Sequence, residues 1–153
     1  MFKKIKNVLV DQLKTGVSPE KLTDAVIAGA LVGVFPLLGA TTALAFLSGY
    51  FFKLNQVVIQ AVNYLFYPVQ LLMIPVYIKV VSLIFNVGDV PIRPDFILKK
   101  FNENFLEFFR LYGLIALYAI FLWIIGSIIL FFLLRPLVVK FIYKLKGVQK
   151  WNG

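Results

Sequence analysis

The chain has 153 residues, of which 61% are hydrophobic and 15% charged, with a formal net charge of +9 and a mean hydropathy of +0.89. Soluble domains are nearer half apolar and a quarter charged, so this composition predicts a single integral membrane domain over residues 1–153. Because the chain has no Cys and no His, thiol chemistry, disulfides, the common zinc sites and a His-based triad are excluded, and we expect no enzyme, no metal and no cofactor.

The first predicted element is a short amphipathic helix over residues 2–14. Its apolar side chains Phe2, Ile5, Leu9 and Leu13 share one stripe. Lys3, Asp11 and Lys14 lie away from the stripe, Lys6 lies at its edge, and Val10 breaks the pattern. Such a helix is typical of a membrane surface, here the cytoplasmic one. A plain cytoplasmic tail is the alternative.

A second helix is predicted to begin at the next turn. Ser18 suits its N-cap, and Pro19 suits its first helical position. Ala25, Gly29 and Gly33 then recur every four residues, which makes one face of the helix nearly flat. Faces of this kind let membrane helices approach closely, so we expect these residues to serve packing.

The most informative feature of the sequence is a break in the apolar run between residues 25 and 52. Pro36 disfavours helical geometry just before it, Gly39 supplies a flexible turn, and Thr41 or Thr42 is predicted to cap a second half-helix. Arms of roughly eleven and thirteen residues are each too short to cross a ~30 Å hydrocarbon core. The break therefore predicts a re-entrant hairpin, with a single kinked span as the alternative, and the exposed N–H groups of the second half-helix predict an anion site.

The next segment, to about residue 85, is predicted to be a membrane helix broken at Pro68 and again at Pro75. Lys79 follows within an apolar stretch, either reaching toward an interface or adding a buried positive charge. The helix carries one polar stripe. Either these side chains hydrogen-bond across packed helices, or they line a hydrophilic path or headgroup groove. The stripe consists of Lys53, Gln56, Gln60, Asn63, Tyr67 and Gln70.

Three further elements complete the predicted all-α membrane fold. Residues 95–112 read as an amphipathic surface helix, 111–134 as the one full transmembrane helix, and 135–153 as a basic tail. The basic residues flank apolar spans, which indicates cytoplasmic termini near anionic lipid rather than a nucleic-acid partner. With both termini cytoplasmic, residues 25–87 must cross the membrane an odd number of times, as a re-entrant hairpin plus one Pro-broken helix would.

About half of the chain, residues 14–87, resembles a bacterial integral membrane family catalogued as domain of unknown function two-zero-six-two. In that family an Asn-Pro-x-Thr element precedes a further Pro; here Tyr67, Pro68, Gln70 and Pro75 occupy it, so its Asn and Thr are replaced. Some relatives are joined to a glycosyltransferase domain of the kind that uses polyprenyl-phosphate lipids, which implies a link to envelope glycan metabolism. The resemblance rests on the motif residues Gly16, Ser18, Pro19, Gly29, Gly33, Pro36, Gly39, Thr42, Lys53 and Asn55.

The function predicted from the sequence is binding or translocation of an anionic lipid or polyprenyl phosphate in the bacterial cytoplasmic (inner) membrane. The alternative is a non-catalytic scaffold or partner subunit of a membrane enzyme such as a glycosyltransferase. We also expect a homodimer, because interrupted helices often need a second copy to bury them. The predicted ligand residues are Gly39, Thr41, Thr42, Lys53, Asn55, Gln60, Asn63, Gln70 and Lys79, and the predicted structural motif residues are Ser18, Pro19, Gly29, Gly33, Pro36, Pro68 and Pro75.

Overall fold

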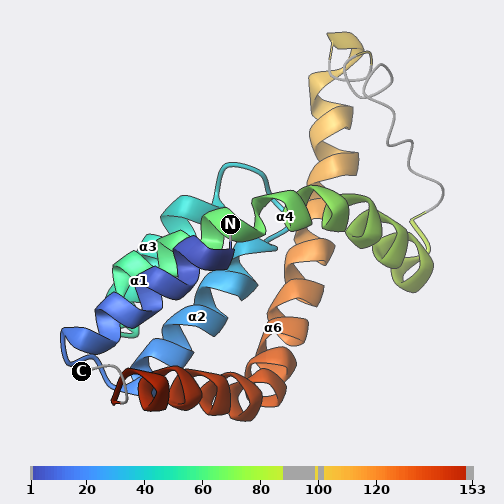
Figure 1. Ribbon diagram of the computed structural model, residues 1–153. Coiled ribbons are helices and arrows are strands. Elements are labelled where there is room, and N and C mark those ends of the chain that lie inside the picture. The colour runs from blue at the N-terminus through green and yellow to red at the C-terminus, as the bar shows by residue number, and fades with distance from the viewer. Residues whose placement is uncertain (1, 88–98, 100–101, 151–153) are drawn as a thin grey trace.

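The computed structural model describes residues 2–87, 99 and 102–150, in which helices joined by turns are the only regular secondary structure (Figure 1). Two of its helices are long and apolar enough to cross a membrane, over residues 56–85 and 112–145. These features support a membrane protein of the all-α class, as predicted. The helices are α1 (Phe2–Lys14), α2 (Pro19–Gly33), α3 (Thr41–Phe51), α4 (Gln56–Phe85) and α6 (Phe105–Lys150).

The predicted break separates α2 from α3. Ser18 caps α2 by accepting a hydrogen bond from the Lys21 N–H at 3.3 Å, as predicted. Gly39 adopts a φ of +83°, a left-handed conformation that favours glycine. The predicted threonine cap on the second half-helix is wrong: Ala40 occupies the N-cap position of α3, and its methyl group cannot accept a hydrogen bond. Thr41 is instead the first helical residue.

The small-residue face of α2 packs directly on α4. A Cβ atom added to Gly29 would lie 2.7 Å from the Ile59 carbonyl oxygen, and one added to Gly33 would lie 2.6 Å from the Phe66 Cβ. Ala25, on the same face, is fully buried. The packing role predicted for this face is therefore confirmed. Because Gly29 meets Ile59 and Gly33 meets Phe66, α2 and α4 run in the same direction.

The prediction that Pro68 and Pro75 break the second membrane helix is wrong, because α4 runs unbroken from Gln56 to Phe85 with both prolines inside it. Both proline rings are exposed on the helix surface. Each proline removes one backbone donor, and membrane helices tolerate that loss when neighbouring groups satisfy the freed carbonyl. The helix curves along its length instead of stopping (Figure 1).

The prediction of separate C-terminal elements also needs correction. Residues 95–98, 100 and 101 of the predicted surface helix 95–112 lie outside the described residues. From Phe105 on, this segment, the transmembrane segment and most of the basic tail form one helix, α6. After Pro136 the helix turns and runs back toward α1 (Figure 1). Ile142 is fully buried there, in one cluster with Leu9 and Leu13 of α1. The tail is thus a packed helix whose apolar side holds it against α1.

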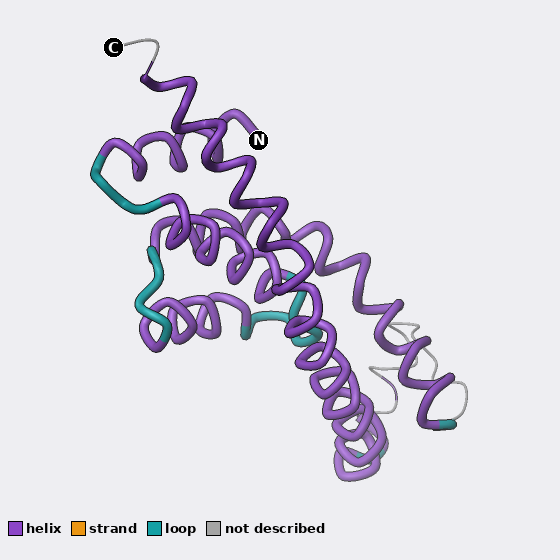
Figure 2. Tube along the Cα trace, turned by 90° about the horizontal axis from the view of Figure 1, so that it is seen from below, coloured by secondary structure: helices purple, strands orange, loops and turns teal. Residues whose placement is uncertain are grey.

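These contacts place both ends of the α2–α3 hairpin on one side of the molecule. The hairpin (α2, the 34–40 turn and α3) begins just after α1, and it ends at the turn into α4. At that turn Asn55 donates a side-chain hydrogen bond to Gln12 of α1. The tube view shows the hairpin beside α4 and α6 from a second direction (Figure 2).

Candidate functional site

The break between α2 and α3 leaves backbone carbonyls without helical partners, and Gln70 satisfies two of them. Its Nε2 donates to the Phe35 carbonyl at 2.8 Å and to the Leu37 carbonyl at 3.2 Å. The Gln70 side chain is almost completely buried, at 1% exposed. Both amide hydrogens of Gln70 are therefore used to hold the break.

Two aromatic donors satisfy the end of α2. Tyr77 of α4 donates its hydroxyl to the Val34 carbonyl at 3.0 Å, and Trp123 of α6 donates its indole N–H to the Leu31 carbonyl at 2.8 Å. The Trp123 ring also packs edge-on against Phe35, with ring centroids 4.9 Å apart. Helix ends without such partners are costly in an apolar medium, so these bonds explain how irregular backbone is tolerated here.

Two further residues of the polar stripe bind α3 in the same way. Gln56 Nε2 donates to the Phe46 carbonyl at 2.8 Å, and Gln60 Nε2 donates to the Thr42 carbonyl at 3.2 Å. For Gln56, Gln60 and Gln70 the structure thus supports the packing alternative, in which stripe residues hydrogen-bond across helices. Tyr67 is different, because it is 51% exposed.

The structure brings only some of the predicted ligand residues together. Gln60 meets Thr42 at the first turn of α3, and Thr41 beside it is buried, whereas Gly39 is exposed. Lys79 is exposed on α4, about 28 Å along the helix axis from Gln60 at 1.5 Å per residue. A single small headgroup does not reach both.

The other predicted residues occupy different places. Asn55 is the N-cap of α4, where its Oδ1 accepts from the Val58 N–H at 3.1 Å. Lys53 is exposed in the preceding turn, with a φ of 52°. Asn63 is buried on α4, at 2% exposed, where α4 meets the end of α2.

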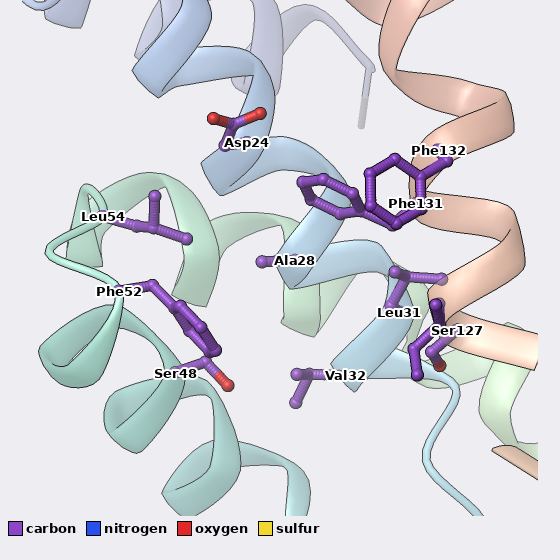
Figure 3. A pocket seen from close by; sticks show the side chains of 11 residues that line it. Asp24, Ala28, Leu31, Val32, Ser48, Phe52, Leu54, Ser127, Phe131 and Phe132 are labelled. Atoms are coloured by element: carbon purple, nitrogen blue, oxygen red, sulfur yellow. The ribbon is translucent and has the colours of Figure 1, made fainter. Parts of the chain in front are cut away.

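A pocket of about 450 Å³ lies between α2, α3 and α6, and none of the predicted ligand residues lines it. Its volume is in the range of small-molecule sites. In Figure 3 the Phe52 and Phe131 rings stand on opposite sides, and Ala28 of α2 lies between them. The walls are mostly apolar. The lining residues are Asp24, Ala28, Leu31, Val32, Ser48, Phe52, Leu54, Ser127, Ile128, Phe131 and Phe132.

An ion pair marks one end of this pocket. Asp24, a lining residue, accepts hydrogen bonds from Arg135 at 2.8 Å (Nε to Oδ1) and 3.4 Å (Nη2 to Oδ2). The Arg135 side chain is 44% exposed and the Asp24 side chain 24% exposed, so solvent or a lipid headgroup can reach both. One helical turn earlier on α2, Glu20 accepts a hydrogen bond from the Tyr143 hydroxyl. These contacts fix α6 against the start of α2.

Sequence reasoning missed this pocket. Its two signals were present: Asp24 is the last acidic residue before the apolar break, and Arg135 is the first charge after the longest apolar stretch. Charges that end two neighbouring membrane segments on the same side are natural partners. The sequence does not say, however, that α6 packs on α2 rather than elsewhere.

Comparisons with family models, curated proteins and solved structures found no match. The resemblance stated from the motif residues therefore stays a prediction. Within the part of the chain that the structure describes, no three carboxylates cluster as a metal site would require.

Proposed function

We propose that the protein is a small polytopic membrane protein that binds an anionic lipid in the pocket between α2, α3 and α6. The observation that carries this proposal is the combination of an apolar pocket of about 450 Å³ with the Asp24–Arg135 pair at its end. An amphiphile needs such a site, with apolar walls for its chain and a partly exposed cation for its headgroup.

The proposal includes a placement in the bilayer. The uncharged stretch of α6 between Arg110 and Arg135 is about 36 Å long, enough for a ~30 Å hydrocarbon core. Trp123 lies at its middle and bonds the end of α2, while Arg135 at its end pairs with Asp24 near the start of α2. These two contacts favour an α2 that enters at the interface and ends near mid-depth. The hairpin is then re-entrant, and α4 and α6 are the spans.

Arg135 is the group proposed to hold the headgroup. A guanidinium presents two parallel N–H donors that match a phosphate as well as a carboxylate. Arg135 already uses this geometry toward Asp24, so a phosphate would bind beside Asp24 or displace it. The alkyl or isoprenoid chain would lie along Ala28, Leu31 and Phe131.

The test is native mass spectrometry of the purified, delipidated protein with three added lipids: phosphatidylglycerol, a polyprenyl phosphate and phosphatidylcholine. We expect the first two to bind and phosphatidylcholine to bind weakly. Arg135→Gln should weaken anionic lipid binding about tenfold or more, since hydrogen bonds to charged groups contribute about 1.5–3 kcal/mol. Lys144→Gln removes an exposed charge elsewhere on α6 and is the matched control, with affinity unchanged.

A second variant tests the apolar walls of the pocket independently of the Arg135 charge. Ala28→Leu narrows the pocket without changing any charge, and it should lower the affinity for all lipid chains. Unchanged lipid binding in both Arg135→Gln and Ala28→Leu would contradict the proposed site. Failure of any anionic lipid to bind the original chain would favour the alternative, a non-catalytic partner of a membrane enzyme.

A further inference from the structure

Three side-chain oxygens on α4 are buried and accept no hydrogen bond from any described residue. They are Gln56 Oε1, Gln60 Oε1 and Asn63 Oδ1. Their spacing of four and then three residues puts them on one face of the helix. This face is the one that α3 and the end of α2 cover, as the contacts of Gln56, Gln60 and Asn63 show.

The orientation of the two glutamine amides is fixed by their donors. Gln56 Nε2 donates to the Phe46 carbonyl, and Gln60 Nε2 donates to the Thr42 carbonyl. Rotating either amide by 180° would place its side-chain oxygen against the backbone carbonyl oxygen that now accepts the hydrogen bond. Each amide therefore presents its oxygen as an unused acceptor, and the whole Gln56 amide packs against Gly49 of α3, where an added Cβ would lie 2.3 Å from Nε2 and 2.8 Å from Oε1.

Leaving these oxygens unsatisfied is costly. A buried polar atom that has given up its hydrogen bonds to water without gaining a partner destabilises the fold, and this helix face carries three such atoms. Because all three are acceptors, they attract a donor and repel a phosphate. All three oxygens belong to uncharged amides. Their bound partner is therefore expected to be water and not a cation, because a buried cation needs a compensating negative charge.

We propose that these three oxygens bind water that enters at the interfacial end of α4 and reaches the end of α2. The interfacial end is marked by Asn55, which bonds Gln12 of α1 immediately before Gln56. From Gln56 to Asn63 the hydrated face extends about 10 Å, a third of a ~30 Å hydrocarbon core. This inference uses the proposed bilayer placement, but it does not depend on the proposed lipid site, because none of the three residues lines that pocket.

Cysteine accessibility tests the proposal. The chain has no cysteine of its own, so a thiol introduced at one position is the only one that can react. Single variants Gln60→Cys and Asn63→Cys place a thiol on the hydrated face. Ile59→Cys and Val62→Cys are matched controls at the same depth, where α4 packs on Gly29. Each folded variant is treated in lipid vesicles with silver nitrate, a probe small enough to follow water. The free thiols that remain are then counted with a maleimide after denaturation, and thermal unfolding of each variant verifies its fold.

We expect the thiols of Gln60→Cys and Asn63→Cys to react about tenfold faster or more than those of the two control variants. The reason is that a thiol in contact with water ionises readily, and each unit by which burial raises a thiol pKa lowers the thiolate fraction tenfold. If Asn63→Cys does not fold, the reaction rate of Gln60→Cys is compared with the control variants by itself. Equal and slow reaction of the face and control positions would show a dry interface and overturn the proposal, whatever the result of the lipid-binding test.

Discussion

At the residue scale, the polar side chains of α4 act mainly as donors to the interrupted backbone beside them. Gln70 bonds two carbonyls of the break, and Gln56 and Gln60 bond carbonyls of α3. An amide is suited to this task, because its N–H₂ group reaches two acceptors without bringing a charge into the membrane. Glutamines therefore occupy the stripe where unpaired backbone carbonyls of α3 and of the break need a donor.

Gln70→Leu tests this role. It leaves the Phe35 and Leu37 carbonyls without their side-chain donor, so the free energy of unfolding should fall by about 1–3 kcal/mol. Equilibrium unfolding in mixed detergent micelles measures the change. Tyr67→Phe, at an exposed position of the same stripe, is the control and should change stability by less than about 0.5 kcal/mol. Equal effects of the two substitutions would mean that Gln70 does not hold the break.

At the element scale, close approach of α2 and α4 determines how the hairpin sits. The approach depends on Gly29 and Gly33, since any side chain there would meet the α4 backbone or Cβ atoms. The hairpin can then present its carbonyls within hydrogen-bonding distance of Gln60 and Gln70. Close packing and the polar stripe are thus parts of one arrangement.

Gly29→Ala should destabilise the protein by about 1–3 kcal/mol, although alanine is the better helix former. Its new Cβ would lie 2.7 Å from the Ile59 carbonyl oxygen, which is backbone and cannot move aside cheaply. Gly126→Ala is the control, because a Cβ at Gly126 meets no described atom within 4 Å. That substitution should leave stability unchanged or raise it by up to about 1 kcal/mol. Thermal unfolding of both variants in detergent measures the difference, and a Gly29→Ala protein as stable as Gly126→Ala would contradict the close α2–α4 contact.

The sequence predicts those elements whose signals are local. The cap at Ser18, the break at Pro36 and the small face of α2 each depend on residue types at short spacing, and the structure contains all three. The unbroken course of α4 through Pro68 was not predictable in this way, because a proline is compatible with both a stop and a bend. The pocket between α2, α3 and α6 was not predictable either, since it depends on α6 packing against α2, and the residues in contact are about a hundred positions apart in the sequence.

At the scale of the whole molecule, the terminal helices and the hairpin ends gather on one side. α1 and the last part of α6 share the cluster of Leu9, Leu13 and Ile142. Basic residues are frequent in both helices, as is typical of segments beside an anionic leaflet. The far end of α4 instead packs on the first half of α6, where Phe85 stacks on Tyr118 with ring centroids 4.0 Å apart. This division separates two ends of the molecule, and both ends of the hairpin lie at the end that carries α1.

Sidedness of single cysteines tests the re-entrant hairpin, the central claim, most directly. Ser18→Cys, Lys53→Cys and Asn86→Cys place exposed thiols before the hairpin, after it and at the end of α4. They are treated with a membrane-impermeant thiol reagent, once in spheroplasts, which expose the outer face of the cytoplasmic membrane, and once in inverted membrane vesicles, which expose its cytoplasmic face. We expect Ser18→Cys and Lys53→Cys to react only in inverted vesicles, and Asn86→Cys only in spheroplasts. Reaction of Lys53→Cys from the same side as Asn86→Cys would show that the hairpin region crosses the membrane fully, and would contradict the proposed fold in the bilayer.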